Sequence, residues 1–292
     1  MYELINVKGN TYYINSPAKI GLVKLQGGTA CLIDSGNDKS AGKKAKQALE
    51  SLGLTLTAIY NTHSHADHIG GNRYLKDAFG CRIYAPGIEC AYTRHPILEP
   101  ALLFGGNPID ELKHKFLLAE PSEAEALTDE ALPLDFEIIT LPGHTADMVG
   151  FMTPDGAVFL GDCLSSKETL DKYGIGYVYD IGSYLDTLEK VKGLNADIFI
   201  PSHAEPTDDI APLADYNIAK VNEAAERICN ILKEPHTQEE LLKRVFDLYG
   251  LTMTAEQYAL IGSTVRSYLV YLKSADKVGF EIKDNTMLWQ AK

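Results

Sequence analysis

The sequence has no run of roughly 18 uncharged apolar residues, the length that a helix needs to cross a bilayer. Its first residues also lack the basic and apolar regions of a secretory signal peptide. Cysteine is scarce: the five cysteines are scattered, odd in number and contain no C-x-x-C pair, which favours reduced thiols over a disulfide framework. We therefore expect a cytoplasmic protein without a membrane segment.

Positive charge is scarce as well. The chain has 27 Lys and Arg against 40 Asp and Glu, giving a net charge of −13, and so acidic a surface repels polyphosphates and anionic lipids. No Gly-x-Ser-x-Gly elbow is present to support a serine nucleophile. The composition disfavours nucleic acid as a partner and leaves a small-molecule substrate as the expectation.

The 292 residues allow one medium domain and a small appendage. Up to about residue 206, short β-branched runs alternate with helical patterns and turn residues, which predicts sheets flanked by helices. Strands are expected at 3–7, 11–14, 20–25, 29–33, 56–61, 81–85, 136–141, 149–153, 157–160 and 197–200, and helices at 40–52, 67–79 and 183–194. A less regular, helical insertion at about 87–132 could cover one side of a pocket. Residues 207–292 predict a small, mostly helical C-terminal domain ending in a ribbon.

A cluster of ligand-type side chains follows the strand expected at 56–61. It consists of His63, His65, Asp67 and His68. Alternation along an extended chain points His63 and His65 to one side, and the next turn can bring the other two toward the same space. Gly70 and Gly71 then allow a close approach of the backbone.

Three more ligand-type residues, His144, Asp162 and His203, each follow an expected strand. Strand ends at one edge of a sheet converge, and binding sites collect there. Seven such groups are enough for two divalent metal ions. Imidazole and carboxylate suit zinc, iron or manganese, and zinc is the default for this mixed set.

Four motifs occur in a fixed order along the chain. They are His63-x-His65-x-Asp67-His68, Pro142-Gly143-His144-Thr145, Leu160-Gly161-Asp162 and Pro201-Ser202-His203. Together they resemble the motifs of the metallo-β-lactamase superfamily over residues 1 to about 206. The resemblance implies an α/β fold, a four-layered αβ/βα sandwich with the site at its open edge. It also implies one metal on His63, His65 and His144, another on Asp67, His68 and His203, and Asp162 as the bridge.

Two positions bear on which branch of the family the chain resembles. The best-known β-lactamases carry cysteine where this chain has Asp162, so the aspartate indicates the glyoxalase II-like hydrolase branch instead. Cys163, directly after it, would face away on an extended backbone, and we expect it in the core. Asp147 fits either a hydrogen bond to a ligand loop or a solvated loop position.

The implied reaction is hydrolysis of an ester, thioester or lactone by a hydroxide that bridges the two metals, with Asp67 and Asp162 as the catalytic carboxylates. Three alternatives stay open: a metallo-ribonuclease or phosphodiesterase, an iron-dependent oxidoreductase or persulfide oxygenase on the same ligands, and a metal-responsive nucleic-acid-binding regulator that is not an enzyme. Fold and metal chemistry alone do not choose among them.

Substrate contacts are expected from the glycine-rich segment 172–180, through Tyr173, Tyr177 and Tyr179, although simple packing explains tyrosines there equally well. The tail resembles the winged-helix-like extension of some hydrolases of this family. Residues 236–292 hold seven basic and seven acidic side chains, so they offer no basic face for nucleic acid. Packing against the catalytic domain, or against a second copy in a homodimer, is the expected role.

Overall fold

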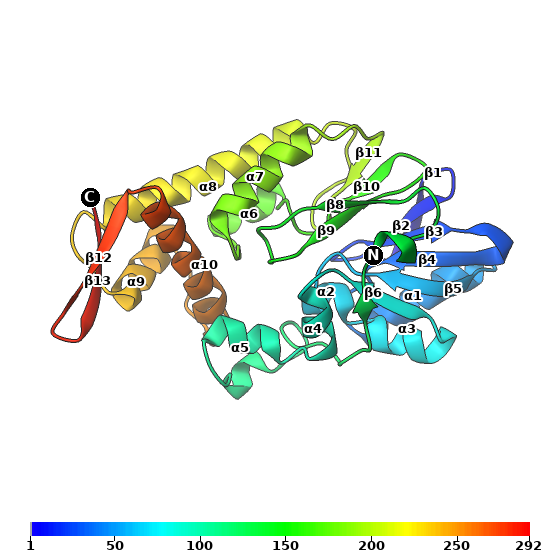
Figure 1. Cartoon of the computed structure of the whole chain (residues 1–292), viewed down its shortest axis with the longest axis horizontal. Helices are drawn as coiled ribbons and strands as arrows, with labels where there is room; N and C mark the ends of the chain where they lie inside the picture. Colours follow the sequence, from blue (N-terminus) through cyan, green and yellow to red (C-terminus); the bar gives the residue numbers. More distant parts are fainter. Residues whose placement is uncertain (1) are drawn as a thin grey trace.

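The computed structural model describes residues 2–292 and has two β-sheets packed face to face, with helices on both outer sides (Figure 1). The first sheet contains β1 (Glu3–Lys8), β2 (Thr11–Asn15), β3 (Ile20–Lys24), β4 (Thr29–Ile33), β5 (Thr55–Tyr60), β6 (Arg82–Ala85) and β7 (Glu125–Ala126), paired in that order. Strands β1 to β4 are antiparallel, whereas β4 to β7 are parallel. The second sheet has the order β11 (Ile198–Ile200), β10 (Ala157–Phe159), β9 (Val149–Met152) and β8 (Glu137–Thr140).

Strand β4 shows how the layers are built. Its side chains alternate between two apolar clusters, because successive residues of a strand point to opposite faces. Ala30 and Leu32 pack with helices α1 (Lys39–Ser51) and α3 (Asn72–Phe79). Cys31 and Ile33 pack between the sheets against residues of the second sheet such as Phe151. The predicted four-layered αβ/βα sandwich is confirmed.

The second sheet and the C-terminal region share one continuous core. Helix α7 (Ile181–Lys192) lies on the second sheet, and α8 (Ala211–Ile231) packs along α7. The core continues through α9 (Gln238–Tyr249) and α10 (Ala255–Ser274) to the ribbon of β12 (Val278–Lys283) and β13 (Thr286–Ala291). A helical C-terminal region is therefore present, and the boundary near 206 and a winged-helix-like character stay proposals.

Three local features differ from, or add to, the sequence prediction. The helix expected at 67–79 is divided into α2 (Ala66–Ile69) and α3, because the chain turns at two glycines. Helix α6 (Lys167–Tyr173), capped by the Ser166 hydroxyl, was not predicted. The segment 87–132 contains α4 (Glu89–Arg94), α5 (Leu98–Phe104), two short 3-10 turns and β7.

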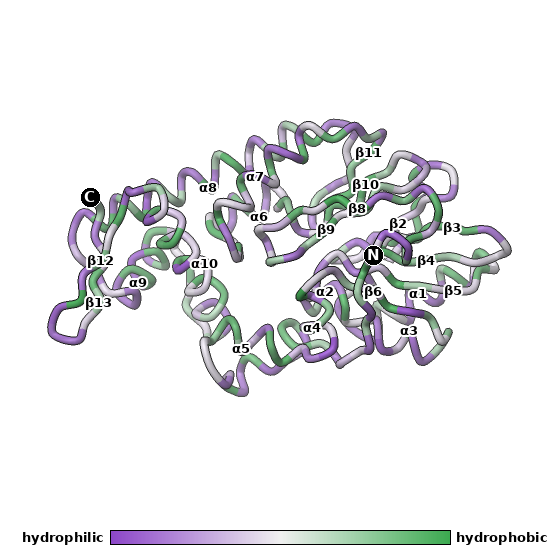
Figure 2. The backbone as a smooth tube through the Cα atoms, viewed as in Figure 1, coloured by the Kyte–Doolittle hydropathy of each residue, from purple (hydrophilic) through white to green (hydrophobic). Residues whose placement is uncertain are grey.

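The long helices carry polar and apolar residues in alternation, which Figure 2 shows for α7 and α8. In the part of the chain that the structure describes, no helix combines the length and the apolar character that crossing a membrane requires.

The turn between α2 and α3 depends on its glycines. A Cβ on Gly71 would lie 2.3 Å from the Ser35 carbonyl oxygen, and one on Gly70 would lie 2.3 Å from the Asn37 carbonyl carbon. The close approach expected at both positions is confirmed. The turn follows directly after the candidate ligands Asp67 and His68, so the course of its backbone also positions these two side chains.

We expect Gly71→Ala to destabilise the protein by about 1–3 kcal/mol, because the backbone must move to admit the methyl group. Urea unfolding followed by circular dichroism measures the change. Gly106→Ala is the matched control, since a Cβ there meets nothing within 4 Å. Equal stability of the two variants would contradict the role of the close approach.

Candidate metal centre

The seven expected ligands meet where strands of both sheets end. His63 and His65 follow β5, and Asp67 and His68 lie in α2. The second sheet contributes one residue after each of three strands, namely His144, Asp162 and His203. Their donor atoms form two groups within 4.8 Å, one of His63, His65, His144 and Asp162, the other of Asp67, His68, Asp162 and His203. Asp162 belongs to both groups, which is the arrangement that the motifs predicted.

In the first group, imidazoles gather around one oxygen of Asp162. His144 Nε2 lies 3.0 Å from His65 Nδ1 and 3.5 Å from Asp162 Oδ2. His63 completes the group, with its ring 4.6 Å from that of His65 and 5.2 Å from that of His144. Three imidazoles and a carboxylate make a complete ligand set for a four-coordinate zinc ion.

The second group is richer in carboxylate. His203 Nε2 lies 3.1 Å from Asp67 Oδ2 and 3.2 Å from Asp162 Oδ2, and His68 Nε2 lies 3.1 Å from Asp162 Oδ1. Two imidazoles and two carboxylates also suit zinc, manganese or iron. Because Asp162 Oδ2 lies near His144 of the first group and His203 of the second, this carboxylate is placed to join the groups.

Buried polar atoms without partners test whether this cluster fits metal ions. His63 Nε2 is buried and has no hydrogen-bond partner among the described residues, whereas the buried His68 Nε2 and Asp162 Oδ1 lie 3.1 Å apart as an ion pair without hydrogen-bond geometry. A buried polar atom left without a hydrogen bond costs about 1–3 kcal/mol, so their gathering in one cluster needs an explanation. Cations held between these atoms would satisfy all three, and the residues therefore fit divalent metals.

For three of the five candidate histidine ligands, outer partners fix which nitrogen faces the cluster. His68 Nδ1 lies 2.8 Å from Asp34 Oδ2, and His203 Nδ1 lies 2.9 Å from the Pro17 carbonyl oxygen. Both oxygens accept, so each Nδ1 carries a proton and Nε2 faces the cluster. His63 Nδ1 is likewise 3.0 Å from the Thr62 hydroxyl, which itself donates to Asp34.

Asp34 is a residue that the sequence analysis missed. It is buried, accepts from the backbone N–H of Thr62 at 2.8 Å as well as from the Thr62 hydroxyl, and has a left-handed backbone with a φ of 61°. The available signal was its place directly after β4, at the same edge as the ligands. Asp34 thus orients His63 and His68 together.

Glu89 joins two of the ligand loops through α4. This buried carboxylate accepts from the backbone N–H and the hydroxyl of Ser64, which lies between His63 and His65. Its other oxygen accepts from Asp147 N at 3.4 Å. The Asp147 carboxylate in turn accepts from Ile88 N at 2.8 Å, so Asp147 ties the loop of His144 to the start of α4.

The charges of the cluster divide the histidines into two classes. Burial lowers the pKa of His65 to about 4 and of His144 to about 3, and also lowers that of His63. The attraction of Asp162 raises the pKa of His203 to about 10. For His68, burial lowers the pKa, but Asp162, Asp67 and Asp34 together outweigh it and hold the pKa well above its ordinary value.

The two carboxylates of the second group shift in the matching direction. Burial raises the pKa of Asp67, but His68 and His203 outweigh it and bring the pKa to about 2. Burial acts in the same way on Asp162, and the attraction of His203 and His68 holds its pKa well below the usual range. Both side chains are therefore anionic at neutral pH, as metal ligands must be.

We expect cation binding to release about two protons at neutral pH, because His68 and His203 are protonated without metal and must become neutral to ligate. The other three histidines are already neutral and release none. Affinity at the second group should therefore fall as the pH drops from 9 to 6, while the first group changes little. Calorimetry in buffers of different ionisation enthalpy measures the release. A pH-independent affinity at both groups would contradict this electrostatic division.

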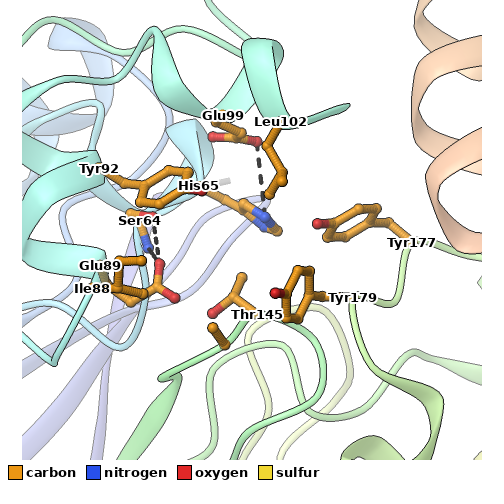
Figure 3. Close-up of a pocket in the computed structure, with 11 residues that line it drawn as sticks. Ser64, His65, Ile88, Glu89, Tyr92, Glu99, Leu102, Thr145, Tyr177 and Tyr179 are labelled. Carbon is orange, nitrogen blue, oxygen red and sulfur yellow. Dashed lines mark hydrogen bonds and ion pairs between the residues drawn. The ribbon is translucent and has the colours of Figure 1, made fainter. Parts of the chain in front are cut away.

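The glycine-rich segment brings two of its three tyrosines to the site. Figure 3 shows Tyr177 and Tyr179 facing His65 across a pocket, with Glu99 on the other side. The Tyr177 ring stands edge-on at 5.3 Å from the His65 ring. Tyr173 instead lies at the end of α6 and lines a neighbouring cavity. The predicted role of these tyrosines in substrate binding stays a proposal.

Cys163 is fully buried, and burial raises the pKa of its thiol. The expected core position is therefore confirmed. Cys31, Cys81 and Cys90 are buried too, Cys229 is half-buried, and all five are free thiols.

Known proteins are similar to this chain in sequence. Residues 15–203 match the family described as the metallo-beta-lactamase superfamily. The chain is 30% identical over 184 residues to a hydroxyacylglutathione hydrolase of Rhodospirillum rubrum, covering 62% of this chain and 59% of that protein. It is 34% identical over 139 residues to the hydroxyacylglutathione hydrolase GloC of Haemophilus influenzae, covering 46% and 61%. The chain thus spans about three fifths of the length of these relatives.

A solved structure extends the likeness to the C-terminal region. A metallo-beta-lactamase family protein from Thermus thermophilus superposes with a TM-score of 0.73 at 20% identity, covering 97% of this chain and 99% of that one. At this identity the likeness concerns the fold alone. The family match covers the ligand-bearing residues, and it agrees with the sandwich fold and with the paired ligand groups. The chain therefore belongs to the metallo-β-lactamase superfamily.

Proposed function

We propose that this chain is a binuclear metal-dependent hydrolase of ester, thioester or lactone bonds in small molecules, with thioesters as the first choice. The observation that carries the proposal is the pair of ligand groups sharing Asp162, in which the buried His63 Nε2 has no hydrogen-bond partner among the described residues. The name of the relatives, hydroxyacylglutathione hydrolase, supports an acyl conjugate of a thiol as the substrate.

Zinc is the proposed ion at both groups, with iron and manganese as alternatives. Two divalent cations would supply a water of lowered pKa and a Lewis acid for the substrate carbonyl. His63, His65 and His144 would hold one ion, and Asp67, His68 and His203 the other, with Asp162 between them. Besides ligating, Asp67 and Asp162 are anionic and lie at the centre, so they can orient a water and accept its proton.

The composition also bears on the competing activities. The chain has a net charge of −13, which makes an anionic polymer a poor substrate. Ribonuclease or phosphodiesterase activity is therefore the second choice after acyl hydrolysis. A cytoplasmic location and a homodimer remain part of the proposal.

A substrate screen tests the assignment. Zinc, manganese and iron forms are assayed with thioester, lactone, phosphodiester and RNA substrates, with the metal content of each form measured. We expect the metal-loaded protein to hydrolyse thioesters or lactones, and His65→Ala to remain at background. Activity on no substrate above this blank would contradict the proposal. An iron-bound protein that consumes oxygen would favour the oxidoreductase alternative.

A further inference from the structure

The pocket beside the first ligand group has an apolar wall. It reaches His65 and Thr145 at its base, and Ile88, Tyr92 and Leu102 of the insertion form one side. Tyr177 and Tyr179 form the opposite side (Figure 3). The pocket is in contact with a candidate ligand, so a group bound there would lie next to the reacting bond.

Apart from tyrosines, the ionisable side chains of this pocket are those of Glu89, Glu99 and His65, and burial holds the pKa of Glu99 well above its ordinary value. None of the eleven described residues that line it is lysine or arginine, and the two carboxyl groups belong to Glu89 and Glu99. Glu99 is buried, with one oxygen 3.8 Å from His65 Nε2. Glu89 is already occupied by Ser64 and Asp147. An anionic group placed among them would lose its hydration without gaining a lysine or arginine side chain as a counter-charge.

Apolar side chains are left open at the mouth of the pocket. Ile88 is 49% exposed and Leu102 is 43% exposed, and both contribute to the wall. Apolar groups that gather at the rim of a concave site are typical of a surface that a ligand covers. The apolar wall therefore favours an apolar ligand, and the absence of lysine and arginine from the described lining residues disfavours an anionic one.

A second groove adjoins the pocket and differs from it in size and charge. It shares Leu102 and Tyr179 with the pocket, is the larger of the two, and runs along α10 past Arg266, with Asp180 also in its lining. The Arg266 guanidinium donates to the Leu103 carbonyl at 3.2 Å and thereby borders the end of α5. The larger groove suits the leaving portion of a substrate, which leaves the smaller pocket for the acyl group.

Resting on the proposed hydrolase function, we propose that this pocket binds an uncharged, apolar acyl group, and that the insertion 87–132 selects against acyl groups that end in a carboxylate. Leu102 on α5 is the specificity-determining position that the test addresses. Under this proposal the thiol portion would occupy the separate groove, so selection would act on the acyl group and not on the thiol.

Two thioesters of N-acetylcysteamine test the proposal, because they differ only at the far end of the acyl chain. The butyryl chain ends in a methyl group, whereas the succinyl chain of equal length ends in a carboxylate. We expect kcat/KM to be at least about tenfold higher for the butyryl thioester. Equal values, or a preference for succinyl, would overturn the proposal.

Leu102→Lys places a cation at the rim of the pocket, and we expect it to reduce the butyryl preference by about tenfold. Leu98→Lys is the matched control, since Leu98 is an exposed residue of the same helix that does not line the pocket. The control should keep the preference of the parent protein. A change of equal size in both variants would show a general charge effect and contradict the assignment to this pocket.

A binding measurement separates this inference from the proposed function. Butyramide and succinamate, two unreactive amides, are compared on the metal-loaded protein by saturation-transfer NMR, with Leu102→Lys alongside. If no thioester is hydrolysed, the proposed function fails, yet stronger binding of butyramide that weakens in the variant still supports the apolar pocket. Equal binding of the two amides, or binding of neither, overturns it.

Discussion

Replacing Asp162 by alanine is expected to remove both metal ions from the purified protein. Among the described residues, Asp162 is the one side chain that belongs to both ligand groups, and its two oxygens face His68 on one side and His144 and His203 on the other. Hydrolysis should fall by about a hundredfold to a thousandfold or more, the loss that follows removal of one essential electrostatic group. Metal content by mass spectrometry and kcat/KM are the two measurements.

The matched control is Asp186→Ala, because Asp186 is an exposed carboxylate on α7 that is not among the candidate ligands. It should keep both metals and full activity. Loss of only one ion from Asp162→Ala would mean that the two groups bind independently, against the bridging role.

Replacing Asp34 by alanine should weaken metal binding without touching a ligand. The change leaves the Thr62 N–H, the Thr62 hydroxyl and His68 Nδ1 without their acceptor in a buried place. Each orphaned group costs about 1–3 kcal/mol, so we expect a loss of at least about 3 kcal/mol in the free energy of unfolding. Metal affinity should fall by about 10- to 100-fold, as when other partners of a ligating histidine are removed.

Asp155 provides the control for Asp34. Its carboxylate also joins two segments, by accepting from Asn10 N at 2.9 Å and from the Thr11 hydroxyl at 2.8 Å, but it lies in the turn before β10, whereas the ligands follow the strand ends. Asp155→Ala should therefore lower stability and leave metal affinity unchanged. If both variants lose stability and neither loses affinity, Asp34 supports only the fold.

The residue pattern of the sequence predicted the candidate metal ligands, but it did not predict the residues that surround and orient them. His63, His65, Asp67 and His68 stand close together in the sequence after a strand, so elementary alternation already placed them in one space. Asp34 and Glu89 gave no such signal, because a single carboxylate after a strand or at a helix start is common. Their roles depend on which loops meet in three dimensions.

Helix α6 was missed for a related reason. It has only seven residues, with the glycines of the next segment close behind, and so short a pattern resembles a loop. The helix expected at 67–79 was interrupted because contacts of Gly70 and Gly71 with a distant loop decide the turn, and periodicity does not reveal them. Strand positions were predicted more closely, since alternation between two apolar clusters is a local property of each strand.

The candidate ligands come from both sheets, and this affects the stability of the folded protein as well as its chemistry. One cation would be held by residues after β5 on one side and after β8 and β10 on the other. The second would be held by α2 and by residues after β10 and β11, so each would act as a cross-link across the sandwich. Binding to the folded chain alone adds about 2.7 kcal/mol of stability when the free ion is a hundred times its dissociation constant. Metal supply would then govern how long each molecule survives proteolysis, apart from how fast it turns over.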